Sequence, residues 1–149
     1  MPLRRNPSRL RRPFRSGGAL LEAALVLPIL FALGFGMVEY GYFFFVKHAL
    51  QGAARDGARV GIVPSGTNAK IQTTVSNVMQ ASGLSTIGYQ VDIKNGSTDA
   101  ALDVSTATTQ TPVKVVVRCT WSSIGTGLRP MGLIPGATQC KGAAVMMKE

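Results

Sequence analysis

Residues 17–46 read GGALLEAALVLPILFALGFGMVEYGYFFFV, and this stretch decides the fold. Apart from Glu22 and Glu39 it carries no charge. A membrane helix needs about 20 predominantly apolar residues. We therefore expect a transmembrane helix, roughly over residues 19–38 and reaching no farther than 46. Pro28 lies inside the run, but membrane helices tolerate proline, so we expect a local bend and not a helix end.

The residues before the apolar run are strongly basic. Six of the 16 basic residues lie there with no acidic residue among them: Arg4, Arg5, Arg9, Arg11, Arg12 and Arg15. A basic flank of this kind holds an N-terminus in the cytoplasm and places the rest of the chain in the periplasm. Nucleic-acid binding by this arm is disfavoured, because it is rich in proline and lacks interleaved aromatic residues.

The helix should continue beyond the membrane. Tyr40 and residues 42–45 form an aromatic cluster that suits the outer interface of the bilayer. We expect the helix to run over residues 18–62 and to end at Pro64. One of its faces carries a small residue at every fourth position, namely Ala49, Ala53, Gly57 and Gly61. Such a face packs either on a partner helix or on the protein's own sheet, and both interpretations remain open.

The remaining residues, 66–149, predict a small head with an antiparallel sheet, so the fold class is α+β. The expected elements are a helix over 68–81, strands over 89–94, 112–121 and 138–147, and a loop over 97–111. In the second strand, apolar residues alternate with polar ones, which marks one core face.

The two cysteines fall on neighbouring strands of this sheet. An antiparallel connection would bring Cys119 and Cys140 within bonding distance in a compartment where disulfides persist. The alternative is a pair of reduced core cysteines. Neither cysteine has a histidine or cysteine partner at metal-ligand spacing, so we expect no metal and no cofactor.

Glu22 is the fifth residue after the Gly17–Gly18 bond. A basic leader followed by Gly-x-x-x-x-Glu at the edge of an apolar helix resembles the processing signal of type IV pilin-like precursors. In that family a membrane peptidase cuts after the glycine and leaves the helix on the mature protein. The resemblance implies a leader of residues 1–17 and a cut after Gly17. A cut after Gly18 is the alternative.

The chemistry of the residues agrees with this interpretation. Glycine leaves an accessible and extended backbone at the bond that is cut. Glu22 would neutralise the new N-terminal ammonium of its own or a neighbouring subunit, which offsets the cost of a carboxylate in an apolar helix.

Three further segments are similar to the TadE-like family, pilin-like proteins of tight-adherence (Flp) pilus systems. They are EAALVLP at 22–28, EYG at 39–41 and AARDGAR at 53–59. The resemblance implies a minor pilin or pseudopilin in the inner membrane with a periplasmic head, involved in pilus assembly and adherence. The implied partners are the prepilin peptidase, the membrane assembly platform and other pilins. A position in the fibre and one at its base both remain open.

Other interpretations compete with this one. An uncleaved bitopic membrane protein with a periplasmic binding or sensor domain is the main alternative. A twin-arginine export signal at residues 11–14 is disfavoured, because the apolar run is too long and carries Glu22. An enzyme is least favoured, because His48, the only histidine, has no residue at a spacing that suggests a catalytic relay.

Overall fold

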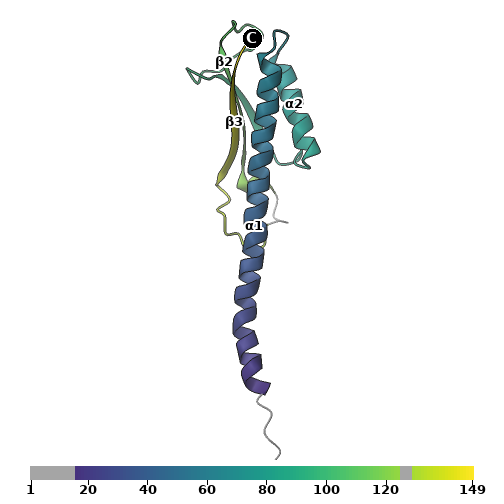
Figure 1. Cartoon of the computed structure of the whole chain (residues 1–149), viewed down its shortest axis with the longest axis vertical. Coiled ribbons are helices and arrows are strands. Elements are labelled where there is room, and N and C mark those ends of the chain that lie inside the picture. The colour runs from purple at the N-terminus through teal and green to yellow at the C-terminus, as the bar shows by residue number, and fades with distance from the viewer. Residues whose placement is uncertain (1–15, 125–128) are drawn as a thin grey trace, which may run out of the picture. The chain divides into compact units, whose positions relative to one another are not determined.

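The structure is a computed structural model that describes residues 16–124 and 129–149. It confirms the expected α+β fold, in which a long N-terminal apolar helix packs on a three-stranded antiparallel sheet (Figure 1). The elements are α1 (Ser16–Ile62), α2 (Asn68–Ala81), β1 (Gln90–Asn95), β2 (Pro112–Thr120), the 3-10 helix η1 (Trp121–Ile124) and β3 (Gln139–Met147).

The chain divides into two compact units, one ending at Gly34 and the other spanning Phe35–Glu149. In the first unit α1 continues through Pro28, and all side chains described from residue 17 to 34 are exposed. A helix that is apolar on all sides is stable only when something other than water surrounds it. By length and composition, α1 is able to cross a membrane.

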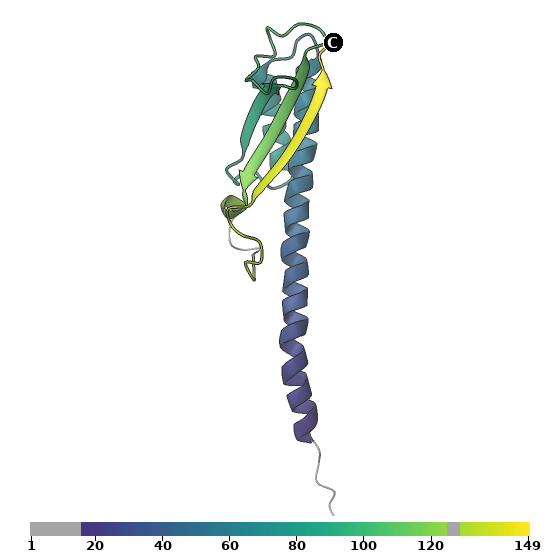
Figure 2. The ribbon, with the colours of Figure 1, turned by 90° about the vertical axis from the view of Figure 1, so that its left-hand side faces the viewer.

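The second unit has a core to which α1 contributes one whole face. Val46, Leu50, Ala53, Ala54 and Ala58 are fully buried. α1 and α2 cover the same face of the sheet (Figure 2). The sequence placed the start of the head at residue 66, whereas the compact unit begins at residue 35, because without α1 the core face of the sheet would stay open.

α2 forms where the periodicity predicts it. The hydroxyl oxygen of Thr67 caps its first turn by accepting a hydrogen bond from the backbone N–H of Lys70 at 3.3 Å. Apolar residues four apart then form its buried face: Ile71, Val75 and Met79.

β2 is the central strand and pairs antiparallel with β1 and β3. Its buried residues alternate as predicted: Val113, Val115, Val117 and Cys119. Trp121, which the sequence assigned to the same strand, opens η1 and is still fully buried. Its backbone N–H donates to the carbonyl of Thr138 at 2.8 Å, so the pairing with the β3 side continues past the end of the strand.

β3 approaches α1 most closely at Gly142. A Cβ atom there would lie 2.4 Å from the backbone oxygen of Leu50 and 2.4 Å from the backbone nitrogen of Gln51. Only glycine allows a strand to lie against a helix backbone at this distance. The position therefore sets how tightly the sheet packs on α1.

The side-chain amide of Gln51 covers part of the free edge of β3. Its Nε2 donates to the carbonyl of Ala143 at 2.7 Å, and the N–H of Ala143 donates to its Oε1 at 3.1 Å. Farther along, the N–H of Glu149 donates to the carbonyl of Ile62 at 3.0 Å, in the last turn of α1. α1 thus satisfies backbone groups that an edge strand would offer to another chain.

The segment 97–111 is a loop, as predicted, and hydrogen bonds of Val104, Leu102 and Asn68 are among those that tie it to the head. Val104 is fully buried, and its N–H donates to Oδ1 of Asn68 at 3.0 Å. The Nδ2 of Asn68 donates to the carbonyl of Leu102 at 3.0 Å. The ammonium of the buried Lys148 donates to the carbonyl of Val104.

We predict that Gly142→Ala lowers the free energy of unfolding by about 1–3 kcal/mol, the usual cost of overpacking. The added methyl group meets helix backbone, which cannot rotate away as a side chain would. Urea titration of the full chain in detergent micelles, followed by circular dichroism, measures the change.

Gly52→Ala in α1 is the matched control, because a Cβ at that position meets nothing within 4 Å. Alanine is more favourable than glycine inside a helix by about 0.5–1 kcal/mol, so this variant should be slightly more stable. Unchanged stability of Gly142→Ala would contradict the close contact between β3 and α1.

Candidate functional site

The expected peptidase bond, Gly17–Gly18, lies in the first turn of α1, which begins at Ser16. The leader residues 1–15 lie outside the described residues. The sequence predicted an extended backbone at this bond, but the backbone is helical, because the apolar run that follows propagates the helix back to Ser16. The first N–H groups of a helix lack helical acceptors, and glycine is a weak helix former. This turn therefore opens at low cost.

Glu22 follows Gly18 by four residues, which places both on the same side of α1, one turn apart. Its side chain is exposed. In a chain that begins at Gly18, the new ammonium and this carboxylate would therefore lie about one helical turn apart.

The small-residue face of α1 packs against the chain's own α2 and β2. Ala53 is fully buried and Ala49 is half-buried. A Cβ at Gly57 would lie 3.0 Å from Val75 and 3.5 Å from Val115, and one at Gly61 would lie 2.8 Å from Ile71. The sequence left open whether this face packs on a partner helix or within the protein. In the structure it packs within the protein.

The opposite face of the same segment carries charge. Arg55, Asp56 and Arg59 are exposed, whereas the small residues of the AARDGAR segment are buried. A partner that contacts this segment would therefore meet the charged face and not the small-residue face.

The sheet brings Cys119 and Cys140 together as direct cross-strand partners, both buried. Cα atoms of such partners lie about 4.5–5.5 Å apart, within the range of about 4.4–6.8 Å that a disulfide takes. The structure has both thiols free, so the bond itself stays a prediction. Burial raises the pKa of the Cys119 thiol to about 12, which keeps it protonated and unreactive at neutral pH in the folded protein.

Glu39 is the site residue to which the sequence analysis assigned no role. Its side chain is fully buried. Its Oε1 accepts a hydrogen bond from the N–H of Ile134 at 3.1 Å, and its Oε2 accepts one from the N–H of Met131 at 3.3 Å. Both donors belong to the loop that precedes β3. The sequence did hold a sign of this contact, since Glu39 is a single carboxylate at the end of an apolar run. A carboxylate that is buried there requires hydrogen-bond partners.

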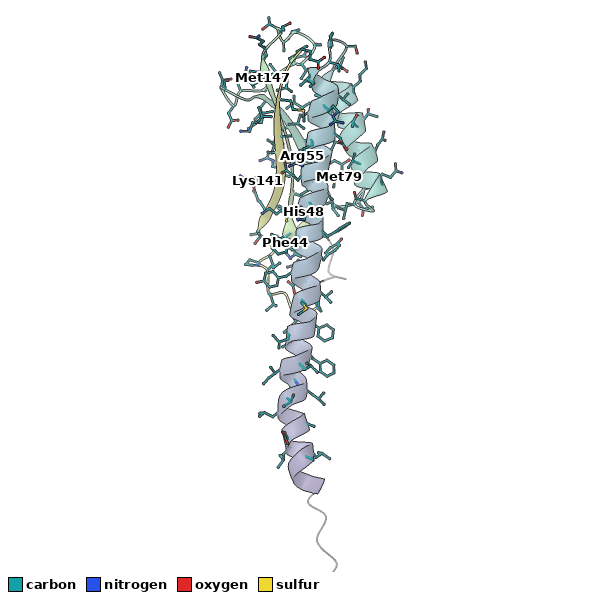
Figure 3. The ribbon with its side chains drawn as sticks, viewed as in Figure 1. Phe44, His48, Arg55, Met79, Lys141 and Met147 are labelled. Carbon is teal, nitrogen blue, oxygen red and sulfur yellow. The ribbon has the colours of Figure 1, made fainter. Side chains whose placement is uncertain are left out.

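The aromatic cluster of α1 divides between core and surface. Tyr42 and Phe43 are half-buried, with ring centroids 6.0 and 5.2 Å from the ring of the buried Trp121. The rings that stay exposed, as the interface assignment requires, are those of Tyr40, Phe44 and Phe45. Figure 3 shows Phe44 on α1 near the end of the sheet at which β3 begins.

Residues 17–59 match the family model described as TadE-like protein. Over these residues the match confirms the resemblance found in the sequence. It begins at the glycine of the expected peptidase bond and ends three residues before the end of α1, so α2 and the sheet lie outside it. No curated protein and no solved structure matches the chain.

We predict that Cys119 and Cys140 form a disulfide in protein isolated from the cell envelope, worth about 3 kcal/mol by its loop length. Denaturation in the presence of an alkylating reagent exposes both positions. Neither thiol should react without a reductant, and both should react after reduction.

The reduced, folded protein is the control for burial. Its alkylation should be slow at neutral pH, because the Cys119 pKa of about 12 leaves little thiolate. If both thiols of the denatured, unreduced protein are alkylated, the cysteines are ordinary core residues.

Proposed function

We propose that this chain is a minor pilin or pseudopilin of a tight-adherence (Flp) pilus, with a structural role and no enzymatic one. The family match over residues 17–59 carries the proposal. It includes the segments at 22–28, 39–41 and 53–59 that resemble the family, and its first residue is the glycine at which the precursor would be cut. We expect no cofactor for such a role.

The proposed location is the inner membrane, crossed once, with the N-terminus in the cytoplasm and the head in the periplasm. Two features support it. The apolar part of α1 is long enough to span a bilayer. The six arginines that precede it give the charge bias that retains a flank in the cytoplasm.

The proposed partners are the prepilin peptidase, the membrane assembly platform and other pilins. The peptidase would act on the Gly17–Gly18 bond once the first turn of α1 opens. Pilins and platform would contact the exposed apolar residues of α1 and the charged face formed by Arg55, Asp56 and Arg59. Glu22 would neutralise the ammonium at Gly18 of its own chain or of a neighbouring subunit in the low dielectric of the membrane.

We predict cleavage after Gly17 in cells that hold the peptidase. N-terminal sequencing of the membrane-extracted protein should then begin Gly-Ala-Leu-Leu-Glu. Gly17→Leu should block processing, because a large side chain replaces the glycine at the cut. Gly18→Ala should leave processing intact and so serves as the matched control.

A sequence that begins Ala-Leu-Leu-Glu would move the cut to the bond after Gly18. An intact mass that retains residues 1–17 would contradict the pilin role and favour the uncleaved bitopic protein.

We predict that Glu22→Leu abolishes surface pili while the protein still inserts in the membrane. Removing a carboxylate from an apolar helix makes insertion more favourable, by up to about 3 kcal/mol near the helix centre and less toward its end. Alkaline extraction of membranes measures insertion, and electron microscopy measures piliation. Ala24→Leu adds the same side chain two positions away and keeps the carboxylate, so it should retain pili. Normal piliation of Glu22→Leu would remove the proposed role of this residue.

A further inference from the structure

Exposed apolar side chains gather at one end of the second unit, around α1 and the loop that precedes β3. Each keeps between 43% and 77% of its surface exposed. These residues, called here the apolar collar, are Met37, Val38, Tyr40, Phe44, Phe45, Met131 and Leu133. Scattered apolar residues are normal on a surface, but a contiguous group of this kind marks an interaction site.

The loop of residues 129–135 extends past the end of the sheet alongside α1 (Figure 2), and the N–H of Met131 in this loop donates to Oε2 of Glu39 in α1. The Cδ1 atom of Leu133 lies 3.4 Å from the position that a Cβ would take at Gly36. Gly36 is within the expected membrane span, two residues before its end. Ile134 faces the core, whereas Met131 and Leu133 face outward. The loop therefore presents its apolar tip at the level where the hydrocarbon is expected to end.

Glu39 satisfies the backbone of this loop. A backbone N–H that leaves water without an acceptor costs several kcal/mol, so a loop that enters an apolar environment needs acceptors from the protein. Glu39 accepts the N–H groups of Met131 and Ile134. The first of these N–H groups is part-buried and the second is buried, so the carboxylate of Glu39 supplies acceptors that water does not.

Cationic side chains flank the collar. The guanidinium carbon of Arg129 lies 6.0 Å from the ring centroid of Trp121. The buried Nε of Arg129 has no hydrogen-bond acceptor among residues 16–124 and 129–149. Lys47 follows the exposed aromatic residues by two positions. Basic residues at the rim of an apolar surface bind lipid phosphates.

The collar surrounds the helix and does not form a groove. At about 100° per residue, Met37, Val38 and Phe45 project from the side of α1 opposite to Gly36 and Glu39. The loop covers the side of Gly36 and Glu39. A fluid environment contacts a helix from all sides, whereas a single protein partner covers one side.

We propose that the loop of residues 129–135 lies in the outer interface of the bilayer that α1 enters. Met131 and Leu133 enter the boundary of the acyl chains, and Arg129 lies at the lipid phosphates. Glu39 is a positioning residue that holds the loop backbone in this place. The inference depends on the membrane span of α1 and not on the pilus role. The cleavage and piliation experiments above therefore do not decide it.

Depth measurements on the full chain in lipid vesicles test the proposal. The vesicles contain three parts phosphatidylethanolamine to one part phosphatidylglycerol. Leu133→Cys carries an environment-sensitive fluorophore, and Met147→Cys is the matched control, because Met147 is exposed at the opposite end of β3 from Phe44 (Figure 3). Labelling of the unsubstituted chain measures any background from the two buried native cysteines.

At position 133 the fluorophore should emit at shorter wavelength and be quenched by spin labels near the headgroup end of the acyl chains. Its quenching by aqueous iodide should be several-fold weaker than at position 147. Equal iodide quenching at the two positions would overturn the proposal. So would protection at 133 that disappears when the vesicles contain less protein, because a second copy would then cover the collar.

Glu39→Gln tests the positioning residue. The amide has one oxygen and presents an N–H₂ group to one of the loop donors, so the loop loses an acceptor. Iodide quenching at position 133 should rise toward the value at position 147, while Glu22→Gln, the same change at an exposed carboxylate of α1, should leave it unchanged. Unchanged quenching in a Glu39→Gln variant that melts as the parent does would overturn the positioning role. If that variant fails to fold, the depth of the label at position 133 in the parent chain still decides the membrane contact.

Discussion

The packing of this protein depends on positions of α1 and β3 that carry no side chain. Gly57 and Gly61 let α2 and β2 lie against α1, and Gly142 lets β3 lie against its backbone. A head of this size has little apolar surface to bury by itself. The helix supplies the apolar surface that covers the sheet. Close contact is needed for this surface to stabilise the head, because dispersion forces fall steeply with distance.

α1 carries two carboxylates in apolar surroundings, and they differ in what satisfies them. Glu39 is buried and accepts hydrogen bonds from the loop before β3, so its partners belong to the same chain. Glu22 is exposed on the apolar part of α1. A carboxylate in that position inside a membrane is costly unless something else neutralises it. The contrast directs the search for an external partner to Glu22 and the search for an internal function to Glu39.

β3 is the strand on which the contacts of the head converge. It pairs with β2 on one side, meets the backbone of α1 at Gly142 and accepts the amide of Gln51 at Ala143. An open edge strand recruits other chains through its backbone. Covering it with α1 suits a protein whose proposed assembly uses helices, because association through the sheet would compete with that assembly.

The sequence by itself determined the elements that depend on local pattern. The length of the apolar run, the four-residue spacing of Ile71, Val75 and Met79, and the alternation of β2 each predicted an element close to its observed bounds. The resemblance to the TadE-like family was also recognised from the sequence, because its motifs lie within one helix. The tertiary structure alone decided which face of α1 is covered and where Glu39 finds its partners. Those outcomes depend on residues about 95 positions apart meeting in space, as Glu39 and Ile134 do, and no local spacing encodes such a contact.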